Sequence, residues 1–550
     1  MPAPVRVVPL GGLGEIGMNC LALECDGRIA VVDCGVLFPS EPIGVDVITP
    51  DLAWLRERRE RVGAVFLTHG HEDHVGALPF LLRDVKVPVY GARFTLALVR
   101  PRLAEAGIEA DLREVAPGDV RPAGDGSPIA AEFFAVTHSI PDACGLAIAT
   151  PQGTLLHSGD FKIDPAPIAG PAMDLGRVEA LGRAGVRLLL SDSTNAERAG
   201  TSLSESEVGA ALEDAFERAR GRVLVACFAS NVHRLQQVAN AARAFGRRLL
   251  LLGRAMETNF RIAQALGYLE VPAWMPVSPE EARELPPKEL CVLTTGTQGE
   301  ARSALARLAR GEHPDLEVAP GDLVVLSSRF IPGNEVAIGQ VVNGLCRRGA
   351  EVAYEGLRPL HVSGHAQEAE QRRLIALARP AAFVPIHGEY RHLARHAAHA
   401  AAEGVARRHV LVNGDVLELS DAGAAVLDEK VPVGRVYADR DALLGGEIAP
   451  IVVKDRRLLA DAGLCIAVLA IERASGAVVR GPDLFARGVA GFEGAEEAIR
   501  DEALRALEEL SGPARADVAE VQETLRVAIR RWFRREVGKK PSVLPVVLEL

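Results

Sequence analysis

The chain has 550 residues, 48% of them hydrophobic and 25% charged, and its formal net charge at pH 7 is -11. Such a composition indicates a globular protein of roughly three to four domains and argues against a broadly basic surface, although a local Arg-lined groove with bound cations still suits phosphates. No apolar stretch approaches the roughly 20 residues that span a bilayer, and no signal peptide is evident, so we expect a cytoplasmic protein with no membrane partner.

The N-terminal region contains a glycine pattern that fits the dinucleotide fingerprint GxGxxG, Gly12-Leu13-Gly14-Glu15-Ile16-Gly17. A dinucleotide site requires a helix directly after these glycines. Residues 19–24 and 29–32, joined by an Asp26-Gly27 turn, instead predict the two strands of a hairpin. We therefore do not expect a nucleotide cofactor here.

A cluster of metal-ligand side chains follows the strand-like run at 64–67 and occupies six positions, His69-Gly70-His71-Glu72-Asp73-His74. Imidazole and carboxylate are natural ligands of zinc-like divalent ions. His69 and His71 alternate, whereas Asp73 and His74 enter a helix and face another direction, so two ions fit better than one. The alternative is a solvated polar loop, but such loops rarely gather four ligand-type side chains.

Two ions need further ligands, and three more side chains each end a strand-like run. They are His138 after 133–136, Asp160 after 154–158 and His387 after 382–386. Taken singly, each is more often a core or turn residue. Their common position at strand ends, where side chains project into a shared cleft, favours a metal site. His157 faces elsewhere on its strand, and we interpret it as structural.

Between about 205 and 350, strand-like runs alternate with helical stretches, which predicts a parallel sheet with crossover helices in a separate α/β domain. Near 515–535 a helix places apolar residues at steps of three and four, Val518, Val521, Leu525, Ile529 and Trp532. Its other face carries Arg526, Arg530 and Arg534. This stripe suits RNA or a partner subunit, although a solvated face is the commoner outcome.

The segment from Thr68 to His74, with His138 and Asp160, resembles the metallo-β-lactamase superfamily. Three later motifs are similar to those of its β-CASP nucleases, and most of all to the ribonuclease J family: Ser191-Asp192-Ser193-Thr194, His361-Val362-Ser363-Gly364-His365 and Pro385-Ile386-His387-Gly388-Glu389. The HxHxDH motif alone indicates only a hydrolase fold. The later motifs favour a nucleic-acid phosphodiesterase.

The resemblance implies an α/β fold. A metallo-β-lactamase αββα sandwich (1–204 and 351–425) would carry an inserted parallel-sheet β-CASP domain (205–350). A linker (426–460) and a small C-terminal α/β domain (461–550) would follow, and the latter would help to assemble homodimers or higher homo-oligomers.

The resemblance also implies two divalent ions per chain, with Zn²⁺ favoured by the His-rich ligands and Mn²⁺ or Mg²⁺ as alternatives. We assign His69, His71 and His138 to one ion, Asp73, His74 and His387 to the other, and Asp160 as the bridge. Asp33 would lie beside the metals. Two close cations neutralise the scissile phosphate and stabilise charge on the attacking and leaving oxygens.

Catalytic roles are expected for Asp73 as a ligand, for Asp192 as an acceptor that orients a metal-bound histidine, and for His365 as a proton donor or charge stabiliser at the leaving oxygen. A structural role is the alternative for His365. The residues expected to bind a terminal 5′-monophosphate are His361, Val362, Ser363, Gly364 and His365, with Phe228, Ser230 and Asn231 forming the opposite wall.

These expectations describe a two-metal ribonuclease that acts on single-stranded RNA with 5′-monophosphate ends, in RNA maturation and decay. Holding the 5′ end one nucleotide from the metals favours 5′ to 3′ exonucleolysis, and threading an internal strand would permit endonucleolysis. A DNA-processing β-CASP nuclease is one alternative. A small-ester hydrolase has no use for the insertion, and a non-catalytic RNA-binding scaffold is not expected to retain all seven ligands.

Overall fold

The computed structural model describes residues 2–39, 43–328, 330, 334–354, 360–439 and 447–550. The described residues fall into two compact units, one within 1–40 and 48–435 and the other within 41–47 and 436–550. Each unit has an α/β fold, as predicted, and each is described by itself.

The first unit contains two large sheets that pack face to face. The strands of one sheet, in spatial order, are β24 (Gly423–Lys430), β23 (Asp415–Ser420), β1 (Val5–Gly11), β3 (Cys20–Cys25), β4 (Arg28–Val32), β6 (Val62–Phe66), β7 (Val89–Ala92) and β8 (Leu112–Val115). Those of the other are β22 (Arg407–Arg408), β20 (Ala382–Ile386), β13 (Val186–Asp192), β12 (Gly153–His157), β11 (Cys144–Thr150), β10 (Ala130–Ala135) and β9 (Val120–Pro122). One buried apolar cluster joins their inner faces, with Leu23 and Phe66 from the first sheet and Phe133 and Val384 from the second.

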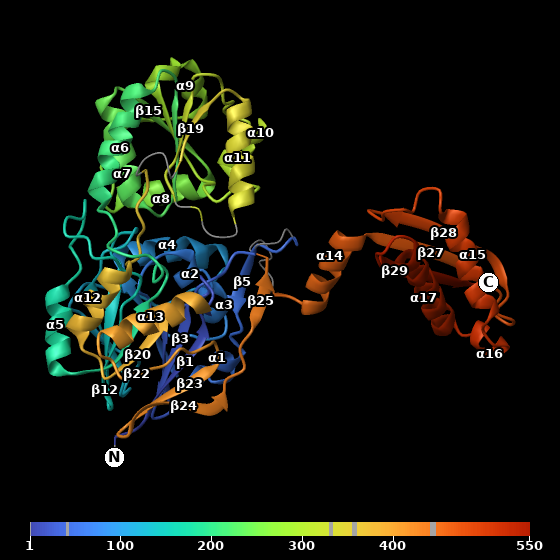
Figure 1. Cartoon of the computed structure of the whole chain (residues 1–550), viewed down its shortest axis with the longest axis horizontal. Helices are drawn as coiled ribbons and strands as arrows, with labels where there is room; N and C mark the ends of the chain where they lie inside the picture. The colour runs from blue at the N-terminus through green and yellow to red at the C-terminus, as the bar shows by residue number, and fades with distance from the viewer. Residues whose placement is uncertain (1, 40–42, 329, 331–333, 355–359, 440–446) are drawn as a thin grey trace. The chain divides into compact units, whose positions relative to one another are not determined.

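Helices cover the outer faces of both sheets. On the first sheet, α4 (Arg93–Glu105) contacts β7 and β8. The short helices α1 (Ala53–Glu57), α2 (Glu72–Val75) and α3 (Leu78–Leu82) lie on the same side of the sandwich. On the second sheet lie α5 (Leu175–Ala184), α12 (Glu368–Ala378) and α13 (Tyr390–Ala402) (Figure 1). The result is the predicted αββα sandwich. The expected hairpin is also present, because β3 and β4 pair antiparallel with Leu21 opposite Val32.

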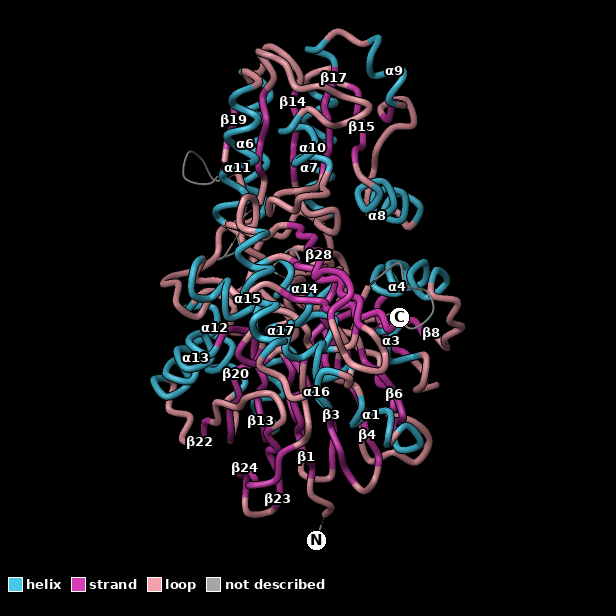
Figure 2. The backbone as a smooth tube through the Cα atoms, turned by 90° about the vertical axis from the view of Figure 1, so that its right-hand side faces the viewer, coloured by secondary structure: helices cyan, strands magenta, loops and turns pink. Residues whose placement is uncertain are grey.

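A third sheet of the same unit is wholly parallel. Its strands, in spatial order, are β16 (Pro276–Val277), β15 (Arg248–Leu252), β17 (Leu290–Thr294), β14 (Val223–Ala226), β18 (Leu323–Leu326) and β19 (Glu351–Ala353). The helices around it are α6 (Glu205–Arg218), α7 (Val232–Ala244), α8 (Arg254–Ala265), α9 (Pro279–Glu284), α10 (Ala304–Arg310) and α11 (Glu335–Arg347) (Figure 2). One face of β14 packs on α7 and the other on α10 and α11. This is the predicted parallel-sheet insertion.

The second unit contains a three-stranded sheet in the order β28 (Val478–Arg487), β27 (Leu464–Ile471) and β29 (Ser542–Glu549), with helices α15 (Glu496–Glu508), α16 (Gly512–Arg515) and α17 (Val518–Glu536). Helix α17 is the amphipathic helix expected near 515–535, and four of its five predicted apolar residues are buried. On its other face Arg526 pairs with Glu523 within the same helix. The segment predicted as a linker, 426–460, holds β25 (Arg435–Ala438), β26 (Glu447–Ile448) and much of α14 (Pro450–Ala462). The domain boundaries stay predictions.

Across the described residues, no helix combines the length and the apolar character that crossing a bilayer requires.

Candidate metal centre

The predicted ligands lie at the ends of neighbouring strands in the two packed sheets. His69 and His71 follow β6, and Asp73 and His74 open α2. The remaining ligands follow strands of the second sheet: His138 after β10, Asp160 after β12 and His387 after β20. The short parallel pair β2 (Leu13–Gly14) and β21 (Gly388–Glu389) brings the N-terminal glycine turn beside the segment that carries His387. Five stretches far apart in sequence therefore meet at one edge of the sandwich.

The first predicted ligand set is in contact. The Nδ1 atom of His71 lies 2.9 Å from Nε2 of His69 and 3.2 Å from Nε2 of His138. One carboxylate oxygen of Asp160, Oδ2, lies 3.6 Å from Nε2 of His69 and 3.8 Å from Nε2 of His138. Four donors around a tetrahedral zinc ion are about 3.4 Å apart, because the metal–ligand distance is about 2.1 Å. The observed separations match this spacing.

The second predicted set shares the same aspartate. Asp160 Oδ2 lies 3.3 Å from Nε2 of His74 and 3.4 Å from Nε2 of His387. An oxygen of Asp73 lies 3.7 Å from Nε2 of His74 and 3.8 Å from Nε2 of His387. Within each set one donor atom per residue lies inside 4.8 Å of every other. The geometry therefore suits two divalent ions with Asp160 between them, while the role of each residue as a ligand stays a prediction.

The pKa values of the imidazoles differ between the two sets, and those of the first set suit cation binding. Burial lowers the pKa of the His71 imidazole to about 3, and it lowers the pKa values of His69 and His138 well below their ordinary range. Burial would raise the pKa of Asp160, but His387 and His74 beside it hold that pKa well below the usual value. Burial would also lower the pKa values of His74 and His387, but Asp160 outweighs it and raises both. Because neutral imidazoles and an ionised carboxylate are the forms that bind metals, a cation at the second set competes with protons for these two rings.

Several candidate ligands are oriented by hydrogen bonds that the sequence motifs did not predict. The Asp33 carboxylate accepts a hydrogen bond from Nδ1 of His74 at 2.8 Å and from the backbone N–H of Thr68 at 2.8 Å. The Gly364 carbonyl accepts one from Nδ1 of His138 at 2.7 Å. Such partners fix which ring nitrogen faces the metal. Asp33 was expected near the metals. Thr68 and Gly364 belong to the quoted motifs, but their hydrogen bonds to these residues were not predicted.

A close backbone approach also shapes the site. At Gly35 a Cβ atom would lie 1.7 Å from the carbonyl oxygen of Asp73, so only glycine permits this contact. The backbone N–H of Cys34, next to Gly35, donates a hydrogen bond to the His74 carbonyl at 2.7 Å. The Asn19 side chain donates one to the Asp73 carbonyl at 3.1 Å. These bonds hold the first turn of α2 against the strand ends.

His365, which is half-buried, pairs with the buried Asp192 beside the candidate ligands. Nδ1 of His365 lies 2.8 Å from Oδ2 of Asp192 and 3.9 Å from Oδ2 of Asp160. Burial would lower the pKa of His365, but Asp192 outweighs it and raises the pKa to about 9. The partner of Asp192 differs from the one expected, because its carboxylate accepts from His365 and not from an assigned metal ligand. His157 accepts a hydrogen bond from the Gly159 N–H at 3.1 Å, in line with a structural role.

The expected phosphate pocket has two walls, the His361–His365 segment and the loop from Phe228 to Asn231. On one wall Ser363 Oγ accepts from Asn195 Nδ2 at 2.8 Å, and a Cβ on Gly364 would lie 2.7 Å from Cε1 of His138. His361 is half-buried and Val362 is buried. On the other wall Asn231 Oδ1 caps α7 by accepting from the Arg234 N–H at 3.0 Å. Phe228 is 37% exposed, Ser230 is half-buried, and Ala229 between them shares one apolar cluster with Val362.

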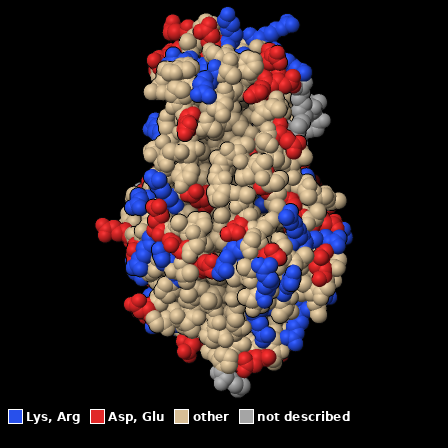
Figure 3. Space-filling view, turned by 90° about the vertical axis from the view of Figure 1, so that its left-hand side faces the viewer, with Lys and Arg blue, Asp and Glu red and all other residues tan. Residues whose placement is uncertain are grey.

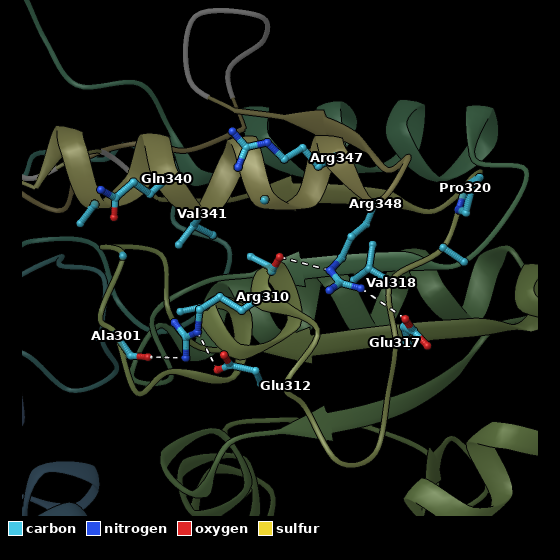
Figure 4. A pocket seen from close by; sticks show the side chains of 16 residues that line it. Ala301, Arg310, Glu312, Glu317, Val318, Pro320, Gln340, Val341, Arg347 and Arg348 are labelled. Atoms are coloured by element: carbon cyan, nitrogen blue, oxygen red, sulfur yellow. Dashed lines mark hydrogen bonds and ion pairs between the residues drawn. The ribbon is translucent and has the colours of Figure 1, made fainter.

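A groove of about 1140 Å³ lies elsewhere in the insertion, along α10 and α11. Two of the arginines that line it are engaged with neighbouring acids, Arg310 with Glu312 and Arg348 with Glu317 (Figure 4). None of its lining residues belongs to the His/Asp clusters found among the described residues. The candidate site is therefore identified by its cluster of metal-ligand side chains and not by the volume of a groove.

The face on the side of α5 and α6 carries basic and acidic side chains close together (Figure 3). Ion pairs such as Arg183–Glu179 on α5 account for part of this mixture. This face therefore offers no single-sign field of the kind that binds a nucleic-acid backbone at long range.

Comparisons with known proteins agree with this arrangement. The chain matches the families described as "Metallo-beta-lactamase superfamily" over residues 14–196, "Ribonuclease J, beta-CASP domain" over 220–345, "Zn-dependent metallo-hydrolase RNA specificity domain" over 349–412 and "Ribonuclease J C-terminal domain" over 451–550. It is 40% identical to ribonuclease J of Mycolicibacterium smegmatis over 100% of this chain and 98% of that protein. It is 36% identical to ribonuclease J2 of Bacillus subtilis over 99% of both chains.

Among solved structures, a protein of unknown function from Enterococcus faecalis V583 matches with a TM-score of 0.55 and 16% identity. The match covers 77% of this chain and 100% of the other. At this identity the likeness concerns the fold alone.

Proposed function

Because the chain belongs to the ribonuclease J family of metal-dependent RNA hydrolases, we propose that it is a two-metal 5′ to 3′ exoribonuclease that prefers single-stranded RNA with a 5′-monophosphate. The observation that carries the proposal is the convergence of seven donors in two sets that share Asp160. Internal cleavage by a strand threaded through the same site is a secondary activity in this proposal.

His69, His71 and His138 would hold one ion, Asp73, His74 and His387 the other, and Asp160 both. Imidazole-rich sets favour Zn²⁺, as does the zinc-dependent family matched over 349–412, with Mn²⁺ or Mg²⁺ as alternatives. When bound, two divalent ions supply positive charge that neutralises the scissile phosphate and stabilises the oxygens that attack and leave.

His365 supplies the proton in this proposal. Its pairing with Asp192 keeps the imidazole charged near neutral pH, because the pKa is raised to about 9. From this position the ring donates a proton to the 3′ oxygen that leaves as the phosphodiester bond breaks, or stabilises its negative charge. Asp192 holds the ring through Nδ1 and leaves Nε2 for the substrate.

The terminal 5′-phosphate would lie between Ser363 and Gly364 on one side and the loop from Phe228 to Asn231 on the other. Asn195 holds the Ser363 hydroxyl in place at 2.8 Å. A hydroxyl and backbone N–H groups suit phosphate oxygens. A monophosphate held here leaves one nucleotide between the pocket and the metals, which sets the cleavage at the first phosphodiester bond.

The test compares matched single-stranded RNAs that carry 5′-monophosphate, 5′-triphosphate and 5′-hydroxyl ends, together with a DNA of the same sequence. We expect the monophosphate RNA to give the highest kcat/KM and to release nucleoside 5′-monophosphates one at a time. Equal rates on the three RNA ends would refute the end-directed proposal. Equal cleavage of DNA would favour the DNA-processing alternative.

Replacing Ser363 by Ala is expected to weaken the end preference selectively. Loss of one hydrogen bond to a charged phosphate costs about 1.5–3 kcal/mol, which is about 10- to 150-fold in kcat/KM. The loss should fall on the monophosphate RNA, whereas the slower triphosphate RNA should change little because the metal ligands are intact. An unchanged ratio between the two RNAs would remove Ser363 from the pocket.

Assembly into homodimers or higher homo-oligomers, a cytoplasmic location and a role in RNA maturation and decay stay predictions. Sedimentation of the purified chain tests the first of them.

A further inference from the structure

Arg234, in the first turn of α7, is a fully buried charged side chain that the proposed reaction does not use. A buried guanidinium is costly unless it is paired and hydrogen-bonded. Nη2 of Arg234 lies 2.8 Å from Oε2 of Glu205, and Nε donates to Oε1 of Gln237 at 3.0 Å. Nη1 donates to the carbonyl of Leu360 at 2.9 Å and to the side chain of Ser327.

These bonds connect the two predicted walls of the phosphate pocket. The backbone N–H of Arg234 binds the Asn231 side chain, which ends the loop from Phe228 to Asn231. Leu360 lies 126 residues further along the chain and directly precedes His361–His365. Its carbonyl also accepts a hydrogen bond from Ser327 Oγ at 2.6 Å. Ser327 follows β18, which pairs with β14, the strand that leads into the Phe228 loop. The guanidinium therefore ties Leu360, next to one wall, to the first turn of α7, which begins directly after the loop that forms the other wall.

The geometry requires arginine and not lysine. The planar guanidinium presents five N–H donors in a rigid fork and thus reaches acceptors on four segments at once, whereas a lysine ammonium is a point charge with three donors. Because the side chain has no exposed surface and its donors point at protein acceptors, Arg234 does not touch RNA and acts through the two walls.

We infer that Arg234 is a positioning residue that sets the separation between the Phe228–Asn231 loop and the His361–His365 segment, and so restricts the pocket to a terminal monophosphate. The inference rests on the proposed function. A fixed separation admits one phosphate and excludes the longer triphosphate. Loosening the link lets the walls move apart, which weakens monophosphate binding and relaxes the exclusion of larger ends.

The test uses the full chain with Arg234→Lys and Arg234→Met, and with Arg247→Lys and Arg247→Met as matched controls. Arg247 is 3% exposed and donates to the carbonyls of Gly221 at 2.8 Å and Ala219 at 3.1 Å, on the segment that precedes β14 of the same sheet. Both pairs of variants should lower the Tm. Only the Arg234 variants should reduce the ratio of kcat/KM on monophosphate RNA to that on triphosphate RNA, by about 10-fold or more and mainly through KM.

Ser327→Ala provides a second, milder variant in case the Arg234 variants do not fold. It removes the hydrogen bond from Ser327 to the Leu360 carbonyl and the side-chain acceptor that Ser327 offers to Arg234. It should lower the same ratio by a smaller factor. A folded Arg234→Lys, or a folded Ser327→Ala if the former is insoluble, that keeps the wild-type ratio would overturn the inference. So would a ratio lowered equally by the Arg247 variants. If the wild-type protein itself shows no preference between the two ends, it is the proposed function that fails.

Discussion

Replacing Asp160 by Asn is expected to lower RNA cleavage about a thousandfold or more. Its Oδ2 atom lies 3.3–3.8 Å from four imidazole nitrogens of the two ligand sets. The amide is nearly the same size but carries no charge, so both ions would lose their shared anionic ligand. Loss of about 4 kcal/mol of transition-state stabilisation corresponds to about a thousandfold in rate. Single-turnover cleavage of a monophosphate RNA, together with metal content by mass spectrometry, measures the effect.

The matched control is Asp164→Asn, four residues further on. Asp164 is also buried, but its carboxylate lies 3.2 Å from Nζ of Lys162 and accepts from the Ala166 N–H at 3.0 Å, away from the ligand sets. This variant should lower the thermal stability while keeping two ions and most of the activity. An Asp160→Asn protein that retains both ions and cleaves at the wild-type rate would contradict the bridging role.

Replacing His71 by Ala is expected to remove one ion and to lower the rate by at least about a hundredfold. The Nδ1 atom of His71 completes the first set with His69 and His138, and two imidazoles with one shared carboxylate hold an ion less tightly than four donors. Metal content should fall from two ions per chain to about one. The Tm of the metal-free variant should be close to that of the metal-free wild type, because the His71 side chain is only half-buried.

His157→Asn is the control for this variant. The Asn oxygen can replace Nδ1 of His157 as the acceptor for the Gly159 N–H, so the turn before Asp160 is kept. We expect two ions and near wild-type activity. Full activity in His71→Ala would remove that residue from the ligand set, and loss of an ion in His157→Asn would add a ligand that the present assignment lacks.

The complete ligand geometry also bears on the non-catalytic alternative. A scaffold that only binds RNA has no need to keep seven donors at metal-binding separations, or to keep Asp192 paired with His365. The structure shows both. Arg234 also connects the insertion to this region, because it bonds both the Leu360 carbonyl, five residues before His365, and the Asn231 side chain.

Sequence alone was sufficient for the features that local pattern encodes. The run before His69, the hairpin after the glycine turn and the strand–helix alternation of the insertion follow from hydrophobic period and turn chemistry, which depend on near neighbours. The seven candidate donors were chosen by the same kind of reasoning, since each lies on a segment that follows a strand-like run and the strands of a sandwich end at common edges. Their role as ligands stays a prediction.

Only the tertiary structure decided how distant segments pair. It determined that His71 faces the site through Nδ1 and His69 through Nε2, that Asp192 binds His365, and that Gly35 passes against the carbonyl of Asp73. It also placed Arg234 against a carbonyl 126 residues away. These contacts join residues that lie far apart in the sequence, where no repeating pattern of hydrophobic residues links them. Their geometry therefore arises only when the packed sheets and the insertion bring the segments together.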